Sequence, residues 1–240
     1  MSIAIDLHTH TLMSGHAYST IEENVAAVAK TSLEGFAVTD HGPAMAGAPT
    51  DFYFLNLIQI PRWLDDVFVL RGAEANIIDF EGNIDIPPRA LNRIDLCIAS
   101  FHDVCIKPGT MEQHTAAWEG VVTNPLIDIL GHPGRGEFDF DVEHIIQLCA
   151  KENKLIEINN HTMDFKKNHD ACRQIAQTCM RMGVPVVVNS DAHFSRAIGR
   201  VSLAEALLAE IDFPPELVLN RTRQGVVDYL KARKPYLKGL

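Results

Sequence analysis

The sequence predicts an α/β protein with a parallel sheet, built as one domain over residues 1–240. Seven short apolar runs rich in β-branched residues alternate with longer stretches of helical periodicity, which is the pattern of β-α units. No linker or low-complexity tract divides the 240 residues, which can bury one large core. Such a sheet is either an open doubly wound layer or a closed barrel, and periodicity alone does not separate the two.

The expected elements follow one another along the whole chain. Strands are expected at Ile3–Leu7, Phe36–Thr39, Val67–Arg71, Leu96–Ser100, Ile127–Gly131, Leu155–Ile158 and Val184–Asn189. Helices are expected at Ile21–Leu33, Asp141–Glu152, His169–Met182 and Leu203–Ile211. Loops at Pro43–Asn56, Lys107–Gln113 and His161–Lys167 are expected to shape the rim of a pocket, and Asp79–Asp85 to form a turn. The basic tail Arg221–Lys238 is expected to be a solvated terminal helix.

Charge and composition exclude several classes of protein. A formal net charge of −10 argues against a nucleic-acid binder, which normally carries a basic stripe. No apolar run reaches the roughly 18 residues of a membrane span, and the first residues show no secretory leader, so the cytoplasm is expected. The five cysteines are scattered without a C-x-x-C pair, so we expect free, structural thiols.

Residues that can bind metal stand at the ends of the expected strands. They are His8 and His10 with His16 shortly after, then His41, Glu74, His102, His132, and finally Asp191 and His193. In barrels, chemistry gathers at the carboxyl ends of the strands, so this placement favours the closed barrel. A single histidine in such a place is more often a hydrogen-bonded structural residue. Seven histidines after five different strands favour a metal site instead.

The spacing of these residues has a geometric meaning. Side chains alternate across a strand, so His8 and His10 project from one face and can grip a common ion. Asp191 and His193 repeat this spacing. Other histidines are interpreted differently: His114 and His144 as helix surface residues, and His169 as the start of a helix. His161 lies at the expected mouth of the pocket, where it could contact substrate.

At these motifs the sequence resembles the PHP (polymerase and histidinol phosphatase) superfamily. The motifs are D-L-H-T-H at 6–10, T-D-H-G at 39–42, G-A-E-A-N at 72–76, G-H-P-G at 131–134 and S-D-A-H at 190–193. H-A-Y-S at 16–19, F-H at 101–102 and E-I-N-N at 157–160 look most like the YcdX-type phosphatases. The resemblance implies a distorted seven-stranded (β/α) barrel, TIM-like, with a trinuclear site, commonly of zinc. A homo-oligomer, with a trimer as the first expectation, is implied by resemblance only.

The resemblance also implies how three divalent ions would be shared among the ligands. His8, His10, Glu74 and Asp191 would hold the first ion, and His16, His41 and His193 the second. His102 and His132 would hold the third, with Glu74 bridging it to the first. Imidazole also accepts manganese, iron or nickel, so zinc is the first of several expected metals. Asp40 and Asn76 are candidates to orient a metal-bound imidazole, and for Asp40 a simple turn cap is the alternative.

Three dications with two carboxylates leave a local charge of about +4, so a small phosphorylated substrate is expected in an otherwise acidic protein. The expected reaction is in-line hydrolysis by a hydroxide that the ions generate, while the same ions bind phosphoryl oxygens. Glu74 and Asp191 are the candidate catalytic carboxylates, and the candidates for the acid that protonates the leaving group are a metal-bound water and His161. Arg135, Arg196 and Arg200 are candidates to bind the phosphate as planar forks.

Three other functions compete with a phosphatase. A phosphodiesterase or exonuclease could use a related site, but the acidic charge and the lack of a basic groove disfavour it. An amidohydrolase-like C–N hydrolase on a similar barrel often relies on a carbamylated lysine, and no expected strand carries a suitable one. A structural metal site is typically a closed four-ligand cage rich in cysteine, whereas these ligands are histidines and carboxylates.

Overall fold

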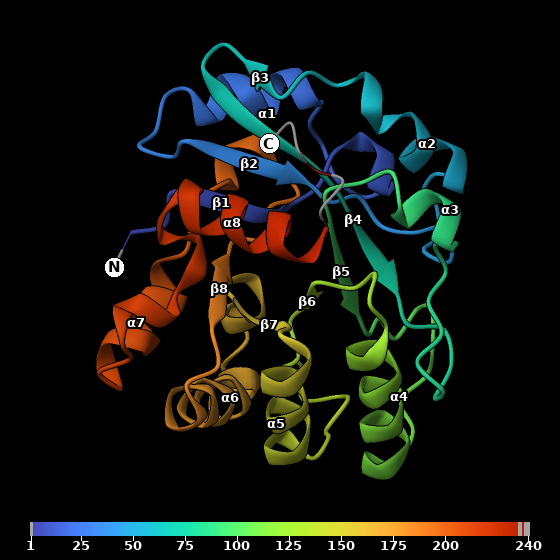
Figure 1. Cartoon of the computed structure of the whole chain (residues 1–240), viewed down its shortest axis with the longest axis vertical. Coiled ribbons are helices and arrows are strands. Elements are labelled where there is room, and N and C mark those ends of the chain that lie inside the picture. The colour runs from blue at the N-terminus through green and yellow to red at the C-terminus, as the bar shows by residue number, and fades with distance from the viewer. Residues whose placement is uncertain (1, 235–236, 238–240) are drawn as a thin grey trace.

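The fold is a parallel sheet that curls into a nearly closed barrel with helices around it (Figure 1). The structure is a computed structural model, and it describes residues 2–234 and residue 237. Neighbouring strands run in the order β1 (Ile5–Thr9), β2 (Gly35–Val38), β4 (Val67–Asn76), β5 (Leu96–Ser100), β6 (Ile129–Leu130), β7 (Leu155–Asn159) and β8 (Val186–Asn189). All these pairs are parallel, and the short β3 (Trp63–Leu64) pairs antiparallel with β4. The expected distorted seven-stranded barrel is confirmed.

The barrel closes between β1 and the end of β8 through an isolated backbone bridge, with His10 N donating to the Ala192 carbonyl at 2.9 Å, and through side chains rather than through a strand ladder. Asn220 fills this gap: its amide nitrogen donates to the carbonyls of Ile5 at 2.8 Å and Val188 at 2.7 Å. Its amide oxygen accepts from the backbone nitrogen of Val188 at 3.0 Å. Asn189 accepts from the Leu7 backbone nitrogen at 2.9 Å. These amides satisfy backbone groups that an open sheet edge would leave unpaired.

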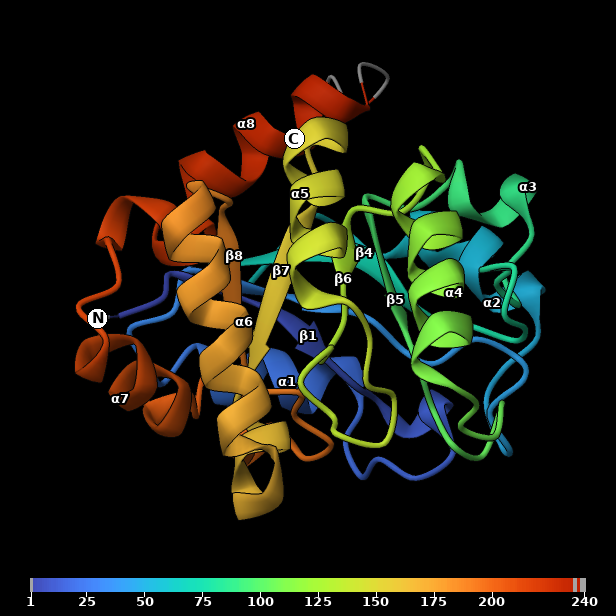
Figure 2. The same ribbon diagram turned by 90° about the horizontal axis from the view of Figure 1, so that it is seen from below.

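Helices cover the outside of the sheet. They are α1 (Ile21–Val28), α2 (Asp51–Asn56), α3 (Pro88–Leu91), α4 (Met111–Thr123), α5 (Val142–Glu152), α6 (His169–Met182), α7 (Ser202–Glu210) and α8 (Arg223–Arg233). Figure 2 shows α4, α5 and α6 side by side against one part of the sheet. Capping boxes start α1 at Thr20 with Glu23 and α4 at Thr110 with Gln113. Among the described residues, no helix has the length and apolar character needed to cross a bilayer.

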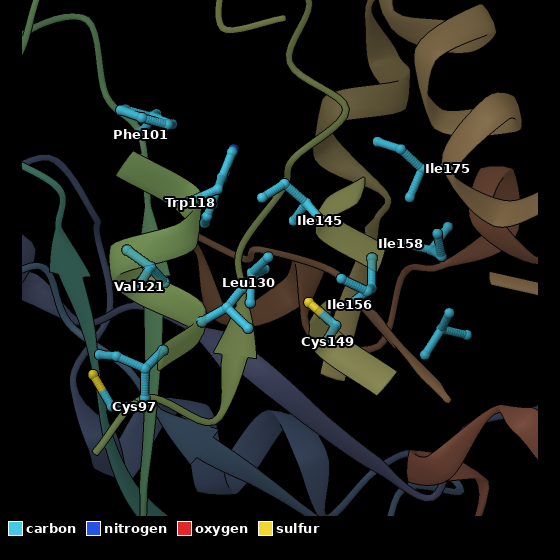
Figure 3. Packing of buried hydrophobic residues seen from close by; sticks show 14 of the residues in the cluster. Cys97, Phe101, Trp118, Val121, Leu130, Ile145, Cys149, Ile156, Ile158 and Ile175 are labelled. Atoms are coloured by element: carbon cyan, nitrogen blue, oxygen red, sulfur yellow. The ribbon is translucent and has the colours of Figure 1, made fainter. Parts of the chain in front are cut away.

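The largest apolar core lies between these helices and the sheet. Figure 3 shows it, with side chains from α4, α5 and α6 facing strand residues: Trp118, Val121, Ile145, Cys149 and Ile175 against Leu130, Ile156 and Ile158. Each is at most 2% exposed, and burial of one such side chain stabilises the fold by about 1.5–3 kcal/mol. Four of the five free cysteines are buried, as expected for structural thiols, and Cys105 is partly exposed.

A second apolar cluster fills the interior of the barrel, below the carboxyl ends of the strands. It combines residues of all seven parallel strands, such as Leu7, Leu70 and Leu155, with Val226 and Leu230 of α8. The expectation that the tail is a solvated helix is therefore wrong, because one face of α8 plugs the amino-terminal end of the strands. The end of that expected helix, up to Lys238, reaches beyond the described residues.

Other expectations also need correction. The expected loop at Lys107–Gln113 already contains the start of α4, and the expected loop at Pro43–Asn56 ends in α2. His114 is buried rather than at the surface: its Nε2 accepts from the Gly109 backbone nitrogen at 2.7 Å. His144 is exposed and His169 begins α6, as expected.

The ion pairs between Asp128 and the carboxyl end of α8 provide a test of stability. Asp128 is fully buried, and its two oxygens accept from Arg233 at 3.0 Å and from the buried Lys234 at 2.6 Å. Asp128→Asn leaves two cations without their carboxylate, so we expect the free energy of unfolding to fall by about 3 kcal/mol. Urea denaturation measures this change. The matched control Asp228→Asn alters an exposed carboxylate of α8 and should shift it by less than about 0.5 kcal/mol.

Candidate metal centre

Strand geometry places the candidate ligands at one end of the barrel. Inward-facing residues follow at every second position: on β4, Leu70 of the interior cluster is followed by Gly72 and then by Glu74. On β7, Leu155 is followed by Glu157 in the same way. Each of these strands therefore has an apolar lower part and a polar carboxyl end. The carboxyl ends of all the parallel strands meet at the same opening.

A register irregularity in β1 turns the two histidines of the H-x-H motif inward. The pairing between β1 and β2 shifts between Asp6 and Thr9. Such a bulge re-aims the side chains that follow it. Leu7 thus packs in the interior apolar cluster while its neighbour His8, fully buried, reaches the carboxylates of the opposite strands. Asp6 stays outside this cluster and accepts from the Gly199 backbone nitrogen at 2.8 Å.

The carboxylate of Glu74 lies at the centre of the histidine cluster. Its Oε1 is 2.9 Å from His132 Nε2 and 3.3 Å from His102 Nε2. Its Oε2 is 2.8 Å from His41 Nδ1 and 3.2 Å from His8 Nε2. One side chain therefore contacts imidazoles from the carboxyl ends of four different strands. This is the geometry expected of a ligand shared between ions.

Asp191 forms the second carboxylate position, close to the gap between β1 and β8. Its Oδ1 is 3.1 Å from His10 Nε2 and 3.6 Å from both His8 Nε2 and His193 Nδ1. Its backbone has φ of 57°, in the left-handed region that costs free energy for any residue other than glycine. Strain of this kind at a ligand position is consistent with a functional constraint.

Four imidazoles, those of His10, His16, His41 and His193, crowd together on one side of the cluster. His16 Nε2 and His193 Nε2 are 3.1 Å apart, and the ring of His16 stacks on that of His41 at 5.0 Å between centroids. The ring of His10 lies 4.2 Å from that of His193. In a protein without ions, such crowding places ring nitrogens close together with no cation between them. Ions between them would convert that crowding into coordination.

The unpartnered polar atoms of the described residues test whether metal fits here. Seven buried side-chain atoms lack a hydrogen-bond partner, and three of them belong to this cluster: His8 Nε2, His41 Nδ1 and Glu74 Oε2. His41 Nδ1 lies 2.8 Å from Glu74 Oε2 but without hydrogen-bond geometry. Buried polar atoms are normally paired, so atoms that converge without pairing fit shared cations. The donor set suits divalent metal.

Among the residues that the structure describes, three groups of donor atoms lie within 4.8 Å of one another and could each hold an ion: His10, His41 and His193; His8, His10 and Asp191; and His41, Glu74 and His102. His10 and His41 each belong to two groups, so the three positions adjoin. The grouping differs from the one implied by resemblance, in which His10 serves only the first ion and His41 only the second.

Polar side chains behind the ligands fix the orientation of the rings. Glu157 accepts from His8 Nδ1 at 2.7 Å, and its other oxygen accepts from the His132 backbone nitrogen at 2.7 Å. Asn76 accepts from His102 Nδ1 at 2.8 Å, as expected for an orienting residue. This role of Glu157 was not predicted from the sequence. Its place two residues after the interior Leu155 was the signal that could have revealed it.

Asp40 acts indirectly. It accepts from Ser14 Oγ at 2.7 Å, and Ser14 Oγ lies 2.9 Å from His10 Nδ1. Tyr53 also donates to Asp40 at 2.6 Å. Asp40 therefore has both of the roles considered for it. It caps a turn by accepting from the Thr11 backbone nitrogen at 2.7 Å, and through Ser14 it also orients the imidazole of His10.

Burial and neighbouring charges set the protonation of the imidazoles. Burial lowers the pKa of His10 well below its usual value, and the nearby His41 and His193 add to this shift. Burial also lowers the pKa of His102, to about 3. For His8, burial opposes protonation, but Glu157, Glu74 and Asp191 together raise its pKa well above the usual value.

The two carboxylates are held in the charged form. Burial alone would raise the pKa of Glu74, but His8, His41 and His102 keep it well below its usual value. The same opposition applies to Asp191, whose pKa the surrounding imidazoles hold well below its usual value. Charged carboxylates and neutral imidazoles are the forms that coordinate metal.

A cavity of about 920 Å³ opens over the cluster. Two of the three candidate arginines, Arg135 and Arg200, line it together with His161. Arg135 reaches inward, with Nη2 3.6 Å from Asp191 Oδ2. The structure does not bring Arg196 to this cavity. That side chain is exposed and lines a separate hollow against α1, because the short helix Ser195–Ala197 turns it away from the strand ends.

Comparison with known proteins gives the family. The family model of the PHP domain matches residues 6–161, and a PHP-associated model matches residues 169–212. A relative from Acetivibrio thermocellus is 43% identical over 239 residues, covering 99% of both chains, and is named a probable phosphatase. A relative from Clostridium botulinum with the same name is 44% identical, covering 100% of this chain and 99% of its own.

Solved structures show the same fold. Histidinol phosphate phosphatase from Lactococcus lactis, complexed with zinc, L-histidinol and phosphate, has a TM-score of 0.62 at 16% identity, covering 89% of this chain and 95% of its own. A chain of archaeal ribonuclease P has a TM-score of 0.58 at 15% identity, covering 97% and 92%. The chain therefore belongs to the PHP domain family and is a phosphatase enzyme within it.

Proposed function

We propose that this phosphatase hydrolyses phosphate monoesters of small molecules at a cluster of three divalent metal ions, with zinc as the first metal and manganese, iron or nickel as alternatives. The observation that carries the proposal is the convergence of four imidazoles on the single carboxylate of Glu74, with unpartnered donor atoms between them. The Lactococcus lactis enzyme, which has this fold, binds zinc and phosphate. That complex supports both zinc and a phosphorylated substrate.

The nine ligand residues would divide as the family resemblance implies. The first ion would take His8, His10, Glu74 and Asp191, the second His16, His41 and His193, and the third His102 and His132 with Glu74. Bound divalent ions supply a nucleophilic hydroxide from water at neutral pH and the positive charge that binds phosphoryl oxygens.

The remaining roles fall to residues of the cavity wall. Arg135 and Arg200 can bind phosphate oxygens, since both line the cavity and guanidinium groups match phosphate geometry. Asp191 contacts both Arg135 and the ligand His10, so its carboxylate lies between the proposed phosphate-binding residue and the metal ligands. His161 lies at the rim with its Nδ1 3.1 Å from Asp164, which leaves Nε2 free to give a proton to the leaving alkoxide.

Two further observations support this assignment. No described strand contains a lysine, which a carbamylated amidohydrolase site would need, so C–N hydrolysis is not favoured. The cysteines are free in the structure, and we propose that the enzyme works in the reducing cytoplasm on a small molecule, as one domain over residues 1–240.

The first prediction concerns the shared ligand. Glu74→Ala should lower the turnover of a generic phosphomonoester by about 10³-fold or more and reduce the bound metal, because several imidazoles lose their common carboxylate. Steady-state kinetics and elemental analysis on the same sample measure both effects. The control Glu81→Ala removes an exposed carboxylate and should change neither. Full activity in the Glu74 variant would refute the site.

The second prediction concerns pH. The raised pKa of His8 means that a metal ion must displace a proton there, so metal affinity should increase as the pH rises. We expect apparent zinc affinity to grow about tenfold per pH unit for each proton displaced, between pH 6 and pH 8. Competition titrations with a chelator measure it. An affinity that does not depend on pH in this range would contradict the protonation assigned to His8.

The third prediction distinguishes Arg135, for which we propose a substrate-binding role, from Arg196, which lies outside the cavity. Arg135→Ala should raise KM for a phosphomonoester by roughly 10–100-fold, because a charged partner of the phosphate is lost. Arg196→Ala removes an arginine of the loop after β8, outside the cavity, and should leave KM within about twofold. Equal effects of the two substitutions would show that Arg135 does not contact substrate.

A further inference from the structure

Four exposed apolar side chains line the cavity above the metal centre, and we call them the apolar collar: Tyr18, Val104, Phe194 and Leu203. They are 72%, 64%, 48% and 37% exposed, respectively. Three of them stand one or two residues after a candidate metal ligand. Tyr18 follows His16, Val104 follows His102, and Phe194 follows His193.

The position of the collar is unusual for exposed apolar residues. Twelve large hydrophobic side chains are exposed among the described residues, and these four share one cavity. Exposed apolar residues that are scattered singly need no explanation, whereas a group around a concave site marks binding. The collar encloses a polar floor, so the cavity has two chemically distinct levels.

Hydrogen bonds hold the collar in place. Tyr18 donates its backbone N–H to the His193 carbonyl at 2.9 Å, and the Ser195 backbone nitrogen donates to Ser19 Oγ at 2.9 Å. The segments that carry Tyr18 and Phe194 are thus tied together. Across the cavity, Leu203 at the start of α7 donates its backbone N–H to Asn160 Oδ1 at 2.9 Å. The fold itself therefore holds in place the segments that carry Tyr18, Phe194 and Leu203.

We propose that the collar binds the leaving group of the substrate, and that this group contains an aromatic ring. The inference rests on the proposed function, because the phosphate must sit on the metal floor for its ester group to reach the collar. A cavity of about 920 Å³ is far larger than a phosphoryl group needs. Flat faces such as those of Tyr18 and Phe194 favour stacking against an aromatic ring. Asp103 and Asp164 also line the cavity and disfavour a second anionic group on the substrate.

Matched esters test the proposal. Benzyl phosphate and glycerol 3-phosphate both release a primary alkoxide, so their intrinsic reactivity is similar while only the first carries a ring. With the metal-loaded full chain, we expect kcat/KM for benzyl phosphate to exceed that for glycerol 3-phosphate by about tenfold or more. A ratio near one would overturn the proposal.

Variants test which side chains cause the preference for benzyl phosphate. Phe194→Ala and Tyr18→Ala should each lower the ratio of the two kcat/KM values by roughly 5–10-fold, and Phe194→Tyr, which keeps a flat ring, should retain most of it. The control Phe52→Ala removes an exposed aromatic side chain of α2 outside the cavity and should leave the ratio unchanged. Metal content is measured for every variant, because Phe194 adjoins His193. A ratio that neither Tyr18→Ala nor Phe194→Ala moves would refute the collar.

Two further outcomes are distinguishable. If neither ester is hydrolysed, the proposed function fails, and calorimetry with benzylphosphonate and methylphosphonate still decides the collar, since tighter binding of the first by about tenfold is expected. If light scattering shows an oligomer that Phe194→Ala dissociates while the ratio stays unchanged, the collar is an interface between copies and the proposal is wrong.

Discussion

Closure of the sheet between its first and last strands is the constraint on which the site depends. His10 and Asp191 are 181 positions apart in the chain, yet their side chains lie 3.1 Å apart because β1 and β8 meet across the gap. Asn220 and Asn189 make that meeting possible by satisfying backbone groups that no ladder pairs. A sheet that remained open there would separate the H-x-H motif from the S-D-A-H motif.

The lower part of the barrel interior stabilises the fold, and the upper part carries the candidate metal ligands. Its lower part is apolar and is sealed by α8, so the fold has a core that does not need metal. Its upper part gathers imidazoles and two charged carboxylates, whose burial is costly unless they are paired or coordinate cations. The rigid lower part positions these groups, and the cost of bringing them together is offset when divalent ions bind.

Much of this architecture could be predicted from the sequence, and the failures have physical causes. Leu96–Ser100 and His169–Met182 were predicted to the residue because apolar period and flanking turns agree there. The role of α8 was missed because its basic residues suggested solvent, whereas its apolar face and Lys234 are buried. The burial of His114 and the role of Glu157 were missed because their partners, the Asp139 carbonyl and His8, become neighbours only through tertiary packing.

The candidate ligands were easier to find than the substrate residues, for a related reason. The ligands lie at or just beyond the carboxyl ends of strands, so strand prediction places them, whereas the direction of a loop side chain depends on local turns. Arg196 and Arg200 lie in the same loop region, yet only Arg200 reaches the cavity. Three of the four collar residues follow a ligand by one or two positions, so the turns that expose an imidazole to metal also aim its neighbour at the leaving group. Substitutions that alter specificity in this barrel should therefore be coupled to metal binding more closely than in folds whose substrate loops are separate.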